Sequence, residues 1–187
     1  MLRIDPAGFE LAAEAGSGGG RLLADALGRL RNTTFAWPGS SAARAAPPPV
    51  LLRAMTVAVA AAGEPGYPTA RGNESYVLDI TLDCARSPCL AVATLNAPQV
   101  WGAIRGLQSF SQLVRYNFSD STYSISTTRI ADGPRFQHRA VMIDTARRFY
   151  PVATILKVLD AMETTKLNVL QCVRLSFLPS VLVMLRC

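Results

Sequence analysis

Histidine and cysteine are scarce in this chain of 187 residues, which has one histidine, His138, and four cysteines. Neither Cys172 nor Cys187 stands at the spacing of metal ligands, and no second histidine is present to complete a site. The sequence therefore predicts no metal centre, and it indicates no cofactor.

Long apolar runs and blocks of one charge are missing as well. No segment reaches the roughly 18 consecutive apolar residues of a membrane helix, so no membrane span is predicted. Residues 1–5 include an acid and no long apolar core, which argues against a signal peptide. The net charge is +6, but the basic residues are dispersed, which favours a solvated surface over a nucleic-acid partner.

What the chain does have is apolar content, since 50% of its residues are hydrophobic and a sizeable core is possible. Residues 2–11 predict a short edge strand interrupted by Pro6, because sheets tolerate proline mainly at edges. Segments rich in Pro, Gly, Ala or Ser predict loops over 40–49 and 61–73. Apolar periodicity predicts the remaining elements: strands over 51–60, 75–82, 90–95, 122–126 and 128–131, and helices over 22–30 and 99–114.

These elements predict an α+β domain that ends near Ala131, because strands outnumber helices along this part of the chain. The helix over 99–114 is expected to pack on the sheet that contains strands 76–82 and 90–95. The face turned to that sheet should carry Ile104, Leu107 and Phe110.

Residues 133–170 show the order strand, helix, strand. The apolar run Ala140–Ile143 predicts a buried parallel strand. Pro151 predicts the first turn of a helix, since its missing N–H needs no partner there. Residues 167–170 begin a second apolar strand, so the stretch predicts one βαβ unit. The expected apolar face of its helix consists of Val152, Ile155, Leu156, Leu159 and Met162.

A family resemblance lies in the same stretch. Its pattern is PRF-x-HR-x-x-x-IDTARRFYPV-x-x-I-x-x-x-LDAM-x-x-x-KLNVL, which closely resembles the opening of the catalytic barrel in the β-N-acetylhexosaminidases, the family 20 glycoside hydrolases. Upstream, Thr94–Val114 resembles the non-catalytic domain of that family. The resemblance implies an α+β fold, with an antiparallel or mixed sheet and packed helices in residues 1–133. The truncated first βαβ unit of a (β/α)8 barrel follows in residues 134–170. Residues 171–187 form a tail that does not resemble the family.

The resemblance also implies an activity. Family members remove terminal non-reducing N-acetylhexosamine residues from glycoconjugates or chitooligosaccharides by substrate-assisted, retaining catalysis, which uses an Asp–Glu pair. Asp132 and Glu163, the acids nearest the barrel opening, do not form such a pair, so no catalytic residue is predicted and the chain alone is expected to be inactive. The alternative is a non-catalytic α+β module that binds a carbohydrate or another partner.

Arg147 is the residue to which the resemblance assigns a substrate role. In the family, the arginine of the D-T-x-R motif hydrogen-bonds hydroxyls of the terminal sugar, and here that motif is Asp144-Thr145-Ala146-Arg147. The alternative is a surface arginine that caps the following helix. Arg148 has no such match, and His138 is expected to hold the connector before the barrel by hydrogen bonds.

Cys84 and Cys89 flank a predicted hairpin loop whose length permits a disulfide. Three Asn-x-Ser/Thr triplets are possible N-glycosylation sites, at Asn32, Asn73 and Asn117. The resemblance implies a secreted, lysosomal or vacuolar protein. It also implies that the intact enzyme can form a dimer. An oxidising compartment favours the disulfide over a metal site at these cysteines.

The resemblance stops after Leu170, where the family continues differently. Gln171-Cys172 fits translation into a retained intron or a shifted frame, and this is the expected origin of the tail. The alternative is a genuine short isoform. Residues 175–185 are too short to span a bilayer, and Pro179 interrupts them. The tail is expected to form neither a regular strand nor a regular helix, with exposed Leu182 and Leu185 and cleavage after Arg174.

Overall fold

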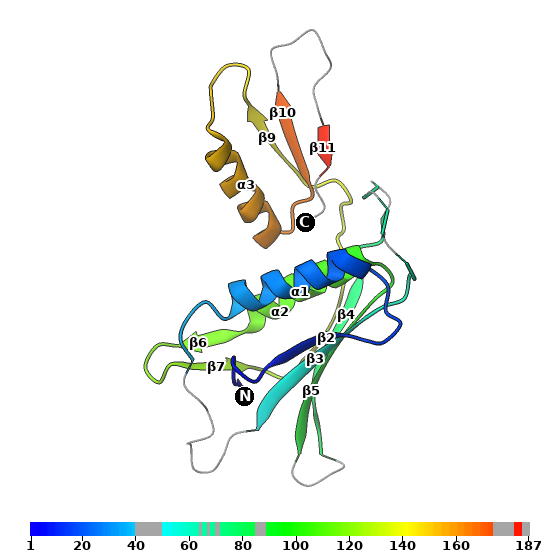
Figure 1. The fold of residues 1–187 in the computed structure, drawn as a ribbon, viewed down its shortest axis with the longest axis vertical. Coiled ribbons are helices and arrows are strands. Elements are labelled where there is room, and N and C mark those ends of the chain that lie inside the picture. The colour runs from blue at the N-terminus through cyan, green and yellow to red at the C-terminus, as the bar shows by residue number, and fades with distance from the viewer. Residues whose placement is uncertain are drawn as a thin grey trace. The chain divides into compact units, whose positions relative to one another are not determined.

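The computed structural model describes residues 1–39, 50–63, 65, 66, 68, 69, 72–84, 89–173 and 182–184 (Figure 1). The chain divides into two compact units: unit 1 contains Met1–Pro65 and Asn73–Gly133, and unit 2 contains Gly66–Gly72 and Pro134–Cys187. The predicted loop over 40–49 lies outside the described residues, as do Arg174, Pro179 and Leu185 of the tail.

Unit 1 is built on one mixed sheet of eight strands, and seven of them follow the order β6-β7-β1-β3-β5-β4-β8. Strand β3 pairs in parallel with β1, β2 and β5, and the remaining pairs are antiparallel. The bounds are β1 Leu2–Ile4, β2 Glu10–Ala13, β3 Leu51–Val59, β4 Tyr76–Asp83, β5 Leu90–Ala97, β6 Arg115–Asn117, β7 Thr122–Ile125 and β8 Thr128–Asp132.

Two helices, α1 (Gly20–Thr34) and α2 (Val100–Leu113), lie side by side over one face of this sheet (Figure 1). The predicted face of α2 is confirmed, because Ile104, Leu107 and Phe110 are buried in the core. A side chain at Gly102 would overlap the carbonyl oxygen of Ser75, so glycine here permits the close approach of α2 to the chain before β4.

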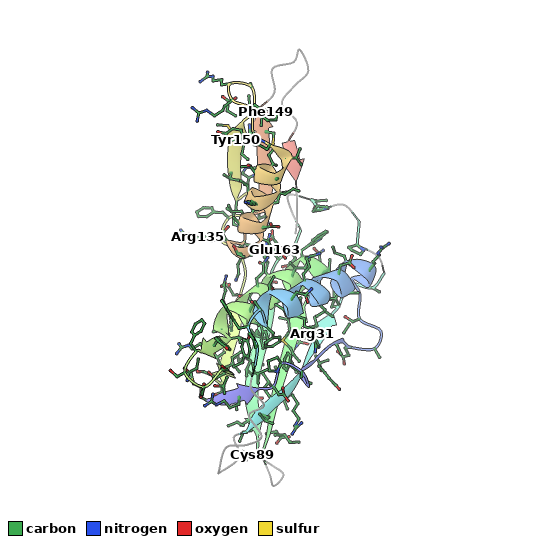
Figure 2. The ribbon with its side chains drawn as sticks, turned by 60° about the vertical axis from the view of Figure 1, so that its left-hand side comes forward. Arg31, Cys89, Arg135, Phe149, Tyr150 and Glu163 are labelled. Atoms are coloured by element: carbon green, nitrogen blue, oxygen red, sulfur yellow. A yellow bond between two sulfur atoms is a disulfide. The ribbon has the colours of Figure 1, made fainter. Side chains whose placement is uncertain are left out.

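The predicted edge strand over 2–11 is wrong for its first half. Strand β1 lies inside the sheet, between β7 and β3, and Pro6 lies in the break between β1 and β2, where it removes no ladder hydrogen bond. Arg31 of α1 holds this break: its guanidinium donates to the carbonyl oxygens of Pro6 (3.2 Å) and Phe9 (2.9 Å) (Figure 2).

The β6–β7 hairpin carries a short charged network at its turn. Asp120 accepts a hydrogen bond from the hydroxyl of Thr122 at 2.6 Å, and its carboxylate lies 3.2 Å from the guanidinium of Arg3 in β1. The Thr122 hydrogen bond, followed by the charge of Arg3, lowers the pKa of Asp120 below its usual range. The carboxylate is therefore charged at neutral pH and ties β1 to the hairpin.

Unit 2 contains β9 (Ala140–Asp144), α3 (Val152–Thr164), β10 (Val169–Val173) and β11 (Leu182–Met184). Strands β9 and β10 pair in parallel with α3 between them, which confirms the predicted βαβ unit. Strand β11 pairs antiparallel with the other edge of β10, so the expectation of no regular strand in the tail is wrong for 182–184. Main-chain hydrogen bonding at an open edge does not depend on side-chain pattern, and this is why periodicity missed β11.

Helix α3 buries little of its predicted apolar face. Met162 is 3% exposed, whereas Val152 is 71% and Leu156 54% exposed. The residues of the helix are apolar at the expected positions, but Met162 is the one residue of α3 that is fully buried, while Ile155 and Leu159 are half-buried.

Candidate functional site

The turn after β9 presents Arg147. One carboxylate oxygen of Asp144 accepts hydrogen bonds from the backbone N–H groups of Ala146 (3.0 Å) and Arg147 (3.1 Å), which closes the turn. The other oxygen lies 3.6 Å from Nε of Arg147, and the Arg147 side chain is 90% exposed. The guanidinium is therefore held only loosely in this state, and most of its donors face solvent.

The same turn is tied to the neighbouring strand. The hydroxyl of Thr145 donates to the carbonyl oxygen of Val173, the last residue of β10, at 2.5 Å. Because β9 and β10 are parallel, their carboxyl ends meet at one edge of the sheet. Arg147 thus stands at the edge where parallel-barrel enzymes place their active sites.

Of the two acids considered from the sequence, Glu163 belongs to unit 2 and Asp132 to unit 1. Figure 2 shows Glu163 and Arg135 at one end of unit 2, and Phe149 and Tyr150 at the opposite end. Phe149 and Tyr150 follow the Arg147 turn directly, so Glu163 is not placed to act beside Arg147. Asp132 belongs to unit 1, where its carboxylate accepts a hydrogen bond from the hydroxyl of Tyr76 at 3.1 Å.

Two residues that sequence reasoning missed hold the start of unit 2. The Asn168 side chain, 3% exposed, accepts from the backbone N–H of Arg139 (3.0 Å) and donates to the carbonyl of Gln137 (2.7 Å). The Arg139 guanidinium donates to the carbonyl of Lys166 (2.8 Å). His138 is exposed and makes no side-chain hydrogen bond to the described residues, so the hydrogen bonds expected of it are made by Arg139 and Asn168.

Polar groups buried in unit 1 join α2 to the sheet. Glu74 and Arg105 form an ion pair at 2.7 Å, with side chains 1% and 4% exposed. Nearby in sequence, the hydroxyl of Tyr76 lies 2.5 Å from that of Ser109, and burial raises the pKa of Tyr76. A shallow hollow of about 540 Å³ opens at this end of the sheet, lined by Ser75, Tyr76, Val77, Asn96, Pro98, Ala131, Asp132 and Gly133. The Glu74–Arg105 and Tyr76–Ser109 pairs each satisfy their own polar groups, which indicates that they stabilise the packing of α2 on the sheet.

The cysteines and sequons lie as follows. Cys84 and Cys89 form a disulfide with their Cα atoms 4.2 Å apart. Asn32, Asn73 and Asn117 are all exposed, with Asn32 in the last turn of α1 and the other two outside helices. Among the described residues, no group of three or more His, Cys, Asp or Glu could hold a metal ion, and no helix is long and apolar enough to cross a membrane.

The two units of the chain match two parts of one family of glycosidases. Residues 2–113 match the family described as β-acetyl hexosaminidase like, and residues 136–173 match the catalytic domain of glycosyl hydrolase family 20. The chain therefore belongs to glycosyl hydrolase family 20, the β-hexosaminidase family of glycosidases.

Individual relatives agree with this assignment. The β-hexosaminidase β subunit of Mus musculus is 42% identical over 154 residues, which cover 80% of this chain and 26% of the relative. A chitobiase of Flavobacterium johnsoniae shares the fold, with a TM-score of 0.67 and 23% identity over 91% of this chain and 24% of that one. A β-hexosaminidase mutant of Streptomyces plicatus, in complex with its product GlcNAc, has a TM-score of 0.56 and 19% identity over 91% of this chain and 31% of that one. The chain thus spans about a quarter to a third of the length of these relatives.

Proposed function

We propose that Arg147 binds hydroxyl groups of a terminal, non-reducing N-acetyl-D-hexosamine residue in an intact β-N-acetylhexosaminidase. The observation that carries this proposal is the 90% exposed Arg147 side chain at the carboxyl end of a parallel strand, in a D-T-x-R turn held by Asp144. A planar fork of donors suits two adjacent hydroxyls. The Streptomyces relative, which holds GlcNAc, supports a sugar ligand of this type.

The activity of the intact protein is then hydrolysis of terminal N-acetylhexosamine from glycans, with the sugar's own acetamido oxygen as nucleophile. That route needs an Asp–Glu pair beside the sugar. In the described part of unit 2, Glu163 lies at the end opposite the Arg147 turn, and Asp144 is engaged in closing that turn. We therefore expect the 187-residue chain to bind sugar weakly and to turn over no substrate by itself.

The test has two arms. In a full-length relative, alanine at the position aligned with Arg147 should cost about 2–5 kcal/mol of transition-state binding, because a charge-assisted fork is lost. The matched control is alanine at the position aligned with Arg148, which should leave kcat/KM within a few-fold. Unchanged kinetics in the first variant refute the role of Arg147. In the second arm, turnover of a chromogenic N-acetylglucosaminide by the purified 187-residue chain refutes its inactivity.

We further propose a secretory route to a lysosomal, vacuolar or extracellular location. The disulfide between Cys84 and Cys89 supports an oxidising compartment. Asn117 is the sequon best placed for a glycan, since it is exposed at the start of a hairpin turn, whereas Asn32 lies within α1. Expression in secretory cells, followed by glycosidase treatment of wild type and Asn117→Gln, should reveal a mass shift that the variant lacks. An unchanged mass refutes occupancy at Asn117.

The second candidate function is a non-catalytic module that binds a carbohydrate or another partner through unit 1. It is favoured by exposed aromatic side chains on this unit, Trp37 at 56% and Phe118 at 71% exposure. Dimerisation of the intact enzyme is a further proposal, which sedimentation of a full-length relative would test.

A further inference from the structure

Three aromatic side chains meet on the surface of unit 1 and form what we call the aromatic corner: Trp37, Tyr116 and Phe118. Trp37 follows α1, Tyr116 lies in β6, and Phe118 begins the turn of the β6–β7 hairpin. Trp37 is 56% and Phe118 71% exposed, although each has ring partners. Exposed rings gathered in one place indicate a binding surface, since scattered exposed apolar residues are the ordinary case.

The three rings of the corner pack on one another. Trp37 and Tyr116 are nearly parallel, at 21° with centroids 6.3 Å apart. Phe118 stands across both of them, at 70° and 5.5 Å from Trp37 and at 89° and 4.8 Å from Tyr116. A ligand with a flat apolar face and an apolar substituent at its side can contact the indole of Trp37 and the ring of Phe118 at once.

Hydrogen bonds fix Trp37 and Tyr116 of the aromatic corner in place. The backbone N–H of Trp37 donates to the hydroxyl oxygen of Tyr123 at 2.9 Å, and the same hydroxyl donates to the carbonyl oxygen of Trp37 at 2.8 Å. Tyr123 is 1% exposed, and the hydroxyl of Tyr116 donates to the carbonyl of Pro38 at 2.9 Å. Because the Trp37 backbone and the Tyr116 side chain are anchored before a ligand arrives, binding has fewer groups to order and costs less conformational entropy.

Size and charge decide the class of ligand. Three rings offer far less than the roughly 800 Å² that a stable protein interface buries on each partner. Platforms that stack nucleic-acid bases combine rings with cations, whereas the three rings of the corner contact other aromatic rings. A neutral pyranose ring has flat C–H faces that can stack on the indole ring of Trp37.

We propose that the aromatic corner binds an N-acetylhexosamine residue of a β-linked glycan, with the sugar ring on Trp37 and the acetamide methyl against Phe118. The choice of this sugar rests on the proposed function, and the site is separate from the Arg147 turn. A glycan on Asn117 would leave the corner open. Tyr116 pairs with Tyr123 and Asn117 with Thr122 across the hairpin, so Asn117 belongs to the opposite face of the ribbon.

The test uses the full 187-residue chain, in which Trp37 and Trp101 are the two tryptophans. Trp101→Phe makes Trp37 the sole fluorescence reporter. Titration of this protein with N,N′,N″-triacetylchitotriose should give a saturable change in Trp37 emission, whereas cellotriose, which lacks the acetamide, should bind at least several-fold more weakly. Phe118→Ala in the same background should weaken chitotriose binding about tenfold and remove its advantage over cellotriose.

Phe136→Ala is the matched control, because Phe136 is 67% exposed and lies in unit 2. It should leave the titration unchanged. Binding that survives Phe118→Ala, or no saturable change with chitotriose, overturns the aromatic corner as a sugar site. Binding that is lost in Arg147→Ala but kept in Phe118→Ala also overturns it and supports the proposed function. Concentration-dependent self-association that Phe118→Ala abolishes would instead assign the corner to contacts between copies, and would likewise overturn it.

Discussion

Replacing Glu74 with glutamine should destabilise unit 1 by about 3–5 kcal/mol, because it leaves the charge of Arg105 buried without its carboxylate. The pair joins Nε of Arg105 in α2 to the residue two positions before β4 at 2.7 Å, with 4% and 1% of the side chains exposed. Glutamine keeps the shape and removes only the charge. A loss of this size is a large part of the roughly 5–15 kcal/mol that stabilises a typical domain.

Tryptophan fluorescence measures this loss in unit 1, since both Trp37 and Trp101 belong to that unit. The midpoint of urea unfolding should fall by about 2 M, given a slope of roughly 2 kcal/mol per molar urea. Glu10→Gln is the matched control, because Glu10 is an exposed acid of β2, and its effect should stay within about 0.5 kcal/mol.

A double-mutant cycle separates the charge effect from packing. Arg105→Met removes the other partner, and the double variant should be less destabilised than the sum of the two single variants, because neither charge is then left alone. The reasoning is refuted if Glu74→Gln moves the midpoint no further than Glu10→Gln does. It is refuted as well if the two single effects add without coupling.

Three further predictions concern unit 1. Gly102→Ala should destabilise it by about 1–3 kcal/mol in urea unfolding, because the new methyl group overlaps the Ser75 carbonyl; a stability equal to wild type contradicts this close approach. Loss of the disulfide in Cys84→Ser should lower the free energy of unfolding by about 2 kcal/mol, since the closed loop is short. Reduction of the wild type should lower it by the same amount, and a smaller effect there would contradict the role of the disulfide. The pKa of Asp120 is lowered in the folded state, so its stabilising effect is present above the ordinary carboxyl pKa and lost as pH falls through the folded value. The difference in Tm between wild type and Asp120→Asn should therefore shrink in acid, and a constant difference would contradict the pKa shift.

Local patterns carried much of the architecture. The helix over 100–113 and the βαβ unit were predictable because periodicity, the proline at Pro151 and the apolar run before Asp144 are properties of neighbouring residues. The position of Arg147 after β9 followed from the motif and from the rule that loops after parallel strands share one edge. Its assignment as a sugar ligand came from the family resemblance and stays a prediction.

Other features escaped the sequence because they depend on partners. Strand β11 exists through main-chain pairing with β10, and its own side-chain pattern does not predict it. Pro6 signals an edge, yet β1 lies inside the sheet because the chain breaks at that proline and resumes as β2 beside the same strand, β3.

By itself, the sequence determined most of the helices and long strands, the family and the residues that belong to its motif, since these depend on spacings of a few residues. Only the tertiary structure decided which distant groups meet. Glu74 pairs with Arg105 inside the protein, and Trp37 packs against Tyr116 and Phe118 on its surface. The physical reason is that such contacts are set by strand register and by helix position on the sheet, which emerge when the whole core packs at once.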